Sequence, residues 1–104
     1  MKMTDEQRAE KLKGMKERTE KMAEGVQAMM EDPSITAKQK AILLTALTDI
    51  RYGDSLMERM INREISPDDK EIEEFMGLIF PKAIMRVGII CKEIEDMKGV
   101  GLDD

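Results

Sequence analysis

Four acidic residues have the types and spacing that could support chemistry. Glu71 and Glu74 form one pair three residues apart, and Glu93 and Asp96 form a second pair with the same spacing. Residues three apart lie on one face of a helix, and carboxylate oxygens are ligands that magnesium prefers. The pattern is therefore compatible with a magnesium ion bound only by carboxylates.

The two acidic pairs resemble the paired motifs of the all-α nucleotide pyrophosphohydrolases. In that family, magnesium and the nucleotide phosphates lie between two helices of a bundle, so the resemblance implies a magnesium-dependent enzyme. This sequence departs from the family pattern because both pairs fall on one continuous predicted helix, with no polar loop between them. A pyrophosphohydrolase-like enzyme is therefore an alternative function, and no residue role is carried over from the family.

The residues that other catalytic mechanisms require are absent from the sequence. The chain has no histidine and one cysteine, Cys91, which excludes histidine-based catalysis, a structural zinc site and an intrachain disulfide. No Walker or dinucleotide-binding glycine pattern occurs. Cys91 lies in the most apolar stretch, so we expect a buried, unreactive thiol. We predict no enzyme activity and no catalytic, cofactor-binding or metal-binding residue.

Methionine is unusually frequent, with 11 in 104 residues. Met15, Met22 and Met29 recur along the first predicted helix and could offer thioether ligands to Cu(I). They would span about 21 Å of helix, which is too far for one ion. We interpret them as packing residues of an adaptable surface, because methionine side chains are flexible.

The formal net charge of −5 argues against nucleic acid as a partner. Phosphate binding needs a dense basic patch, and the basic residues of the first helix are interleaved with glutamate. An acidic surface instead favours a basic protein partner. An acidic regulatory inhibitor of a basic partner is therefore a second alternative function.

The sequence also gives no sign of membrane targeting. It is charged from Lys2 onward with no apolar leader segment, and apolar runs such as 88–91 are too short to span a bilayer. We expect a cytoplasmic protein without membrane association.

Three long helices are expected to position these residues. The first extends from Thr4 to about Met30 and the second from Thr36 to about Arg63, and each opens with the Thr-x-x-Gln pattern of a capping box. The third is predicted to start at Ser66, with Pro67 in its first turn, and to run towards Lys98. Connections of about five and of two or three residues favour antiparallel neighbours.

The predicted fold is all-α, an antiparallel (up-down-up) three-helix bundle. Gly53 and Pro81 interrupt the second and third helices, so we expect breaks or kinks there, or a close approach by another helix at Gly53. Gly99 is the expected end of the third helix. One domain covers 1–99, and 100–104 are expected to form a flexible acidic tail.

The third predicted helix is apolar on two sides. Leu78, Met85 and Ile89 fall on a side separate from its broad core face. That core face is predicted to contain Ile72, Met76, Ile79, Ala83, Val87, Ile90, Ile94 and Met97. Because one side of a helix faces inward in a three-helix bundle, the second side needs a further partner, and a twofold homodimer is the simplest one. The alternative is that the chain bends at Pro81 and packs both sides internally.

Asp54 is the one charge within the apolar stripe of the second helix. We expect a carboxylate at the helix edge that pairs with Lys11 or Lys13 of the first helix, or is solvated. A functional carboxylate that binds a ligand or metal is the alternative.

The sequence therefore favours a small, non-catalytic helical accessory or adaptor protein. We expect it to act through self-association and protein–protein contacts. Its predicted interface residues are Leu78, Met85 and Ile89 on the third helix, and Met15, Met22 and Met29 on the first.

Overall fold

The computed structural model describes residues 4–102, with side chains described up to residue 97. Helix α1 spans Asp5–Met30 and α2 spans Ala37–Ile61. A third helical segment consists of α3 (Lys70–Glu74), a π-helical stretch η1 (Phe75–Ile79) and α4 (Phe80–Leu102). The described part of the chain contains no strand, so the all-helical prediction is confirmed.

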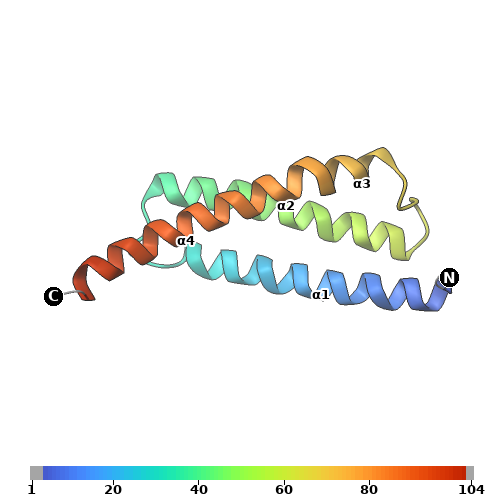
Figure 1. Ribbon diagram of the computed structural model, residues 1–104, viewed down its shortest axis with the longest axis horizontal. Helices are drawn as coiled ribbons and strands as arrows, with labels where there is room; N and C mark the ends of the chain where they lie inside the picture. The colour runs from blue at the N-terminus through green and yellow to red at the C-terminus, as the bar shows by residue number, and fades with distance from the viewer. Residues whose placement is uncertain (1–3, 103–104) are drawn as a thin grey trace.

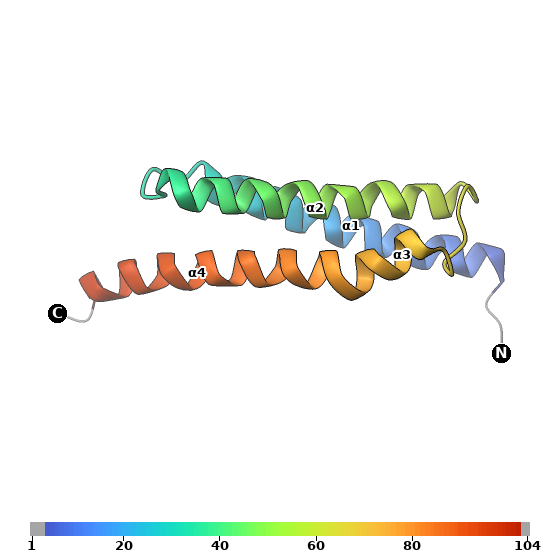
Figure 2. The ribbon, with the colours of Figure 1, turned by 90° about the horizontal axis from the view of Figure 1, so that it is seen from above.

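The three segments run up, down and up along an elongated molecule of 56 × 22 × 21 Å (Figure 1). Helices α1 and α4 pack chiefly against α2 rather than against each other. The last turns of α4 extend past the turn that joins α1 to α2, as both views show (Figures 1 and 2). Helix α2 is therefore the element that holds the other two in place.

The capping boxes predicted for α1 and α2 are present. The hydroxyl of Thr4 accepts from the Gln7 backbone N–H at 3.1 Å, and the Gln7 side chain accepts from the Thr4 N–H at 3.0 Å. Thr36 and Gln39 repeat this pair of hydrogen bonds at the start of α2. Both helices therefore begin where local sequence satisfies their free N–H groups.

Helix α2 ends two residues before the expected position, at Ile61. The Glu64 N–H donates to the Arg59 carbonyl at 2.8 Å, and the Arg63 N–H donates to the Met60 carbonyl at 3.1 Å. This pair of bonds is a Schellman motif. Arg63 has φ 60°, so an arginine occupies the left-handed position that usually holds glycine.

The predicted start of the third helix at Ser66 is wrong. The Asp69 side chain accepts from the Glu71 N–H at 3.0 Å and caps a helix that begins at Lys70. Ser66 instead accepts from the Asp68 N–H at 3.3 Å within a turn. Since Arg63 ends α2 early and Asp69 competes with Ser66 as the cap, the connection covers 62–69 rather than two or three residues.

The expected end of the third helix at Gly99 is also wrong. Helix α4 continues through Gly99 to Leu102, and no described glycine has a positive φ, so Gly99 is not a left-handed cap. Of the expected tail at 100–104, residues 103 and 104 lie outside the described residues.

Pro81 does not split the helical segment. The Phe80 N–H donates to the Phe75 carbonyl, five residues back, and η1 forms the wider turns that precede the proline. A proline ring has no N–H and crowds the carbonyl four residues before it. A π-helical stretch is one known way to accommodate such a defect without ending the helix.

Gly53 permits a close approach rather than a break. Helix α2 is continuous through it, and a Cβ placed there would collide with the ring of Phe75. Phe75 lies edge-on to Tyr52 and tilted to Phe80, with ring centroids 5.9 and 5.5 Å apart. The glycine thus lets an aromatic group from η1 seat directly on α2.

Most of the buried hydrophobic side chains form two clusters. In the first, α1, α2 and α4 meet through Ala23, Val26, Leu43, Ala46, Leu47, Ile50, Ala83 and Ile90. In the second, α2 meets α3 and η1 through Leu56, Ile72 and Phe75.

Two residues assigned to the core from the sequence are exposed. Met76 is 51% exposed, because the smaller rotation per residue in η1 turns it away from α2. Met97 is 56% exposed, near the end of α4 that extends beyond the α1–α2 turn.

Candidate interaction surface on α4

The side of α4 that faces away from α2 carries three large apolar side chains. Leu78 is 52% exposed, Met85 64% and Ile89 51%. On the opposite side, Ala83 and Ile90 are fully buried against α2. The segment η1–α4 is therefore apolar on two opposite sides, and we call the exposed side, with Leu78, Met85 and Ile89, the outer face of α4.

Charged residues continue the outer face between and beyond these apolar groups. Lys82 lies between Leu78 and Met85, and Lys92 follows Ile89 by three residues. Glu74 precedes Leu78 by one turn of η1. Glu74, Lys82 and Lys92 are exposed and form no ion pair within the described part of the chain. Their charges are therefore available to a partner.

On the α2 side of α4, Arg86 and Glu93 already have partners on α2. Arg86 Nη1 donates to Asp49 Oδ2 at 3.3 Å, and Gln39 Nε2 donates to Glu93 Oε2 at 2.7 Å. These bonds fix the rotation of α4 on α2, and they direct the outer face to solvent.

The methionines of α1 lie in a different setting. Met22 and Met29 are partly buried and pack against the first cluster, and Met15 is also partly buried. The Cys91 thiol, itself partly buried, donates to the Met29 sulfur at 3.7 Å. Met22 and Met29 thus lie along the inside edge of α1, where they support the core.

The two acidic pairs are not brought together. Glu71 accepts from Arg59 Nη1 at 3.1 Å and from the Tyr52 hydroxyl at 3.2 Å, whereas Glu93 is held by Gln39. The two glutamates are separated by about 33 Å of helix. No group of three or more His, Cys, Asp or Glu residues in the described part of the chain is arranged to hold a metal ion.

Asp54 does not pair with Lys11 or Lys13. Its Oδ1 is buried without a hydrogen-bond partner among the described residues. Lys16 instead lies between two other carboxylates, 3.7 Å from both Glu20 and Glu58. The prediction fails because, in the antiparallel pairing of α1 and α2, Asp54 lies opposite Lys16 and Glu20, about one turn of α1 beyond Lys11 and Lys13.

The surroundings of Asp54 disfavour its charge. Burial raises the pKa of this carboxyl above its usual range, and Glu20 and Glu58 raise it further. Lys16 and Arg51 act in the opposite direction. Asp54 therefore costs stability when ionised, at the contact between α1 and α2.

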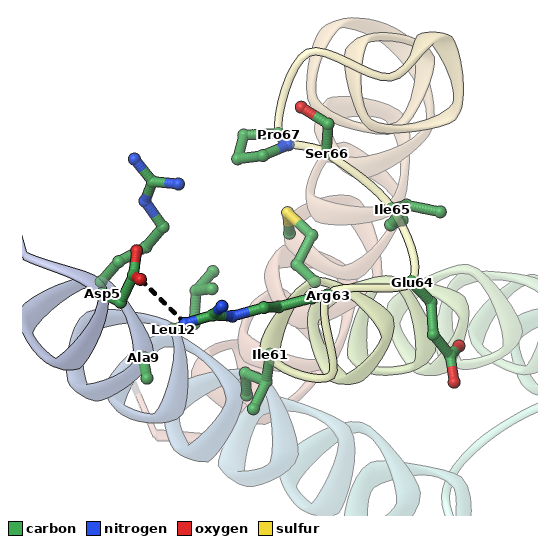
Figure 3. A pocket seen from close by; sticks show the side chains of 11 residues that line it. Asp5, Ala9, Leu12, Ile61, Arg63, Glu64, Ile65, Ser66 and Pro67 are labelled. Carbon is green, nitrogen blue, oxygen red and sulfur yellow. Dashed lines mark hydrogen bonds and ion pairs between the residues drawn. The ribbon is translucent and has the colours of Figure 1, made fainter.

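A hollow of about 420 Å³ opens where the start of α1 meets the end of α2 (Figure 3). Apolar residues such as Ala9, Leu12 and Ile61 line its floor, and Arg63 bonds to Asp5 at 2.9 Å across its rim. No sequence signal predicts it, because it depends on the early end of α2. Two of its charged residues, Arg63 and Asp5, therefore pair with each other rather than with a ligand.

Comparisons with protein-family models, curated proteins and solved structures gave no match for this chain. Among the helices described, none is long and apolar enough to cross a membrane. The geometry of α4 is therefore the observation on which an assignment of function depends.

Proposed function

We propose that the protein is a non-catalytic, cytoplasmic helical interaction module that self-associates through the outer face of α4. The observation that carries this proposal is the exposure of Leu78, Met85 and Ile89 on the side of α4 opposite its buried side. Burial of apolar surface contributes about 25 cal/mol per Å². Contact between two such faces therefore has a clear driving force.

The arrangement of the face supports a specific contact rather than a loose patch. All three side chains stand on one continuous helical segment, which is anchored by buried residues on its other side. A rigid helix holds these side chains at fixed spacing, so binding costs little conformational entropy. An exposed apolar group such as Leu44 lies alone on the outside of α2 and needs no such explanation.

The proposal is tested by the mass of the protein in solution as a function of concentration. Sedimentation equilibrium should show a dimer for the wild type. Leu78→Glu and Ile89→Glu should shift the mass to a monomer, because each places a charge in the contact. Circular dichroism should show that both variants keep their helix content.

Leu44→Glu is the matched control, because Leu44 is 53% exposed and Leu78 is 52% exposed. Its mass should equal that of the wild type. A wild type that stays monomeric up to millimolar concentration contradicts the proposal, as do face variants that remain dimeric.

A further inference from the structure

The outer face of α4 has the spacing of one side of a coiled coil. Leu78, Lys82, Met85, Ile89 and Lys92 follow one another at intervals of four, three, four and three residues. This is the heptad pattern by which two helices pack side by side at a small angle. The expected partner is therefore another helix with the same repeat.

We propose that this partner is α4 of a second copy, packed antiparallel about a twofold axis level with the bond between Ala83 and Ile84. This inference rests on the proposed function and adds the identity and direction of the partner. In this register Leu78 faces Ile89 of the second copy, and Lys82 faces Met85. Each apolar residue then meets an apolar group or the aliphatic stem of a lysine.

Charge decides the direction of the two helices. In the antiparallel register, Lys92 reaches Glu74 of the second copy, and symmetry repeats this pair at the other end of the contact. A parallel pair would instead place Glu74, Lys82 and Lys92 each against its own copy, and like charges repel. The antiparallel arrangement therefore pairs Glu74 with Lys92, and it places Lys82 beside Met85 rather than beside a like charge.

The η1 stretch contributes to this charge pattern. Glu74 is exposed and lies four residues before Leu78, where η1 begins, while Phe75 faces inward onto Gly53. From Glu74 to Lys92 the contact would extend about 27 Å along the helix. The π-helical stretch before Pro81 thus lies between one of the two charges and the apolar side chains that the contact uses.

The outer face of a second copy is a better partner for this face than any other described part of the protein surface. Among the side chains that the structure describes, the other large exposed apolar ones do not form a heptad row; they are Leu44, Tyr52, Met76, Ile84 and Met97. Along one edge of the outer face, Gly77 and Gly88 have open space where a Cβ would stand. A partner helix can therefore approach closely on that edge.

A charge swap tests the direction of packing. Lys92→Glu and Glu74→Lys should each raise the dimer dissociation constant about tenfold, because each change replaces two symmetric ion pairs by two repulsions. The double variant restores opposite charges and should return to within about threefold of the wild type. Lys38→Glu, at an exposed position on α2, is the control for net charge and should leave dimerisation unchanged.

Disulfide trapping gives an independent readout in a Cys91→Ser background. With copper phenanthroline as the oxidant, the pair of changes Leu78→Cys and Ile89→Cys should give a covalent dimer on a non-reducing gel. Either change alone should give little, since neither position faces itself.

The two proposals fail in different ways. Strong cross-linking by Leu78→Cys alone, or a double charge swap that stays weak, overturns the antiparallel register and leaves the outer face in use. A dimer that Leu78→Glu does not weaken overturns the proposed function itself.

Discussion

The two core clusters of this molecule are built in different ways. In the first, three helices meet through aliphatic side chains and alanines, and Leu43, Ala46, Ile50, Ala83 and Ile90 are fully buried. In the second, two segments meet, and a phenylalanine from η1 fits against a glycine of α2. The first cluster is closed by numerous small contacts, whereas the second depends on one close fit.

Helix α1 makes the contrast sharper. Three of its four buried residues, Thr19, Ala23 and Val26, lie in its second half, and Leu12 is the one in its first half. No α1 residue belongs to the second cluster, and the hollow lined by Asp5 and Leu12 opens at that end. The start of α1 is therefore attached less firmly than its end, and the position of Asp54 weakens the same contact.

The largest expected effect comes from one substitution made in each cluster. Leu43→Ala and Leu56→Ala remove the same atoms from fully buried positions. We expect losses in the free energy of unfolding of about 4 kcal/mol for Leu43 and about 3 kcal/mol for Leu56, because the second cluster can relax towards its open side. Urea denaturation followed by circular dichroism measures both values.

Leu44→Ala is the control for this comparison. The Leu44 side chain is half exposed, so its removal should lower the free energy of unfolding far less. Equal losses at Leu43 and Leu56 would show that the two clusters are equally rigid.

Gly53→Ala should give the next largest effect. Alanine favours a helix over glycine by about 1 kcal/mol. At Gly53, however, the added Cβ would collide with the Phe75 ring. We expect a net loss of about 1–3 kcal/mol in the free energy of unfolding, measured by urea denaturation, because an overfilled core must shift.

A smaller side chain at residue 75 should absorb part of this cost. Phe75→Leu is destabilising by itself, but Gly53→Ala should cost less in that background than in the wild type. If Gly53→Ala stabilises the wild type, the close fit of Phe75 on α2 is incorrect.

The sequence was sufficient for the parts of the fold that depend on neighbouring residues. Thr4 and Thr36 cap their helices as predicted, because a capping box is a contact between residues three apart. The alternation of apolar and charged residues likewise separated the exposed Leu78, Met85 and Ile89 from the buried Ala83 and Ile90, although Met97 was wrongly assigned to the buried side.

Features that depend on competition or distant packing were not predictable. Asp69 prevailed over Ser66 as the cap of α3, although both are good capping residues. The π-helical stretch before Pro81 turned Met76 outward, and its formation depends on the packing of Phe75 against Gly53 as well as on Pro81. The neighbours of Asp54 depended on the register between α1 and α2, which a sequence does not state.

Asp54→Asn should stabilise the protein by about 1 kcal/mol near pH 7, because it removes the charge of a partly buried carboxyl whose Oδ1 has no hydrogen-bond partner among the described residues. The folded-state pKa of Asp54 is raised, so the folded protein binds this proton more readily than the unfolded chain. The wild type therefore loses stability as pH rises from about 4 through the folded-state pKa. The advantage of the variant should shrink as pH falls towards 4.

Urea denaturation at several pH values between 4 and 7 checks this prediction, and Asp68→Asn, at an exposed position, is the control. An advantage that is constant across this pH range would mean that Asp54 is ionised without cost in the folded protein.

The smallest effects should come from two glycines of α1, and they report how firmly each half of α1 is attached. At both Gly14 and Gly25, a Cβ would meet no atom within 4 Å, so alanine fits at either position. Gly25→Ala should raise the free energy of unfolding by about 0.5–1 kcal/mol, since its half of α1 unfolds with the three-helix cluster. Gly14→Ala should raise it less, because the first half of α1 can open before the rest unfolds. Its effect should appear instead as slower amide hydrogen exchange in the first half of α1. Equal gains in the free energy of unfolding would show that α1 is held along its whole length, and that the open end of the bundle is as cooperative as the closed one.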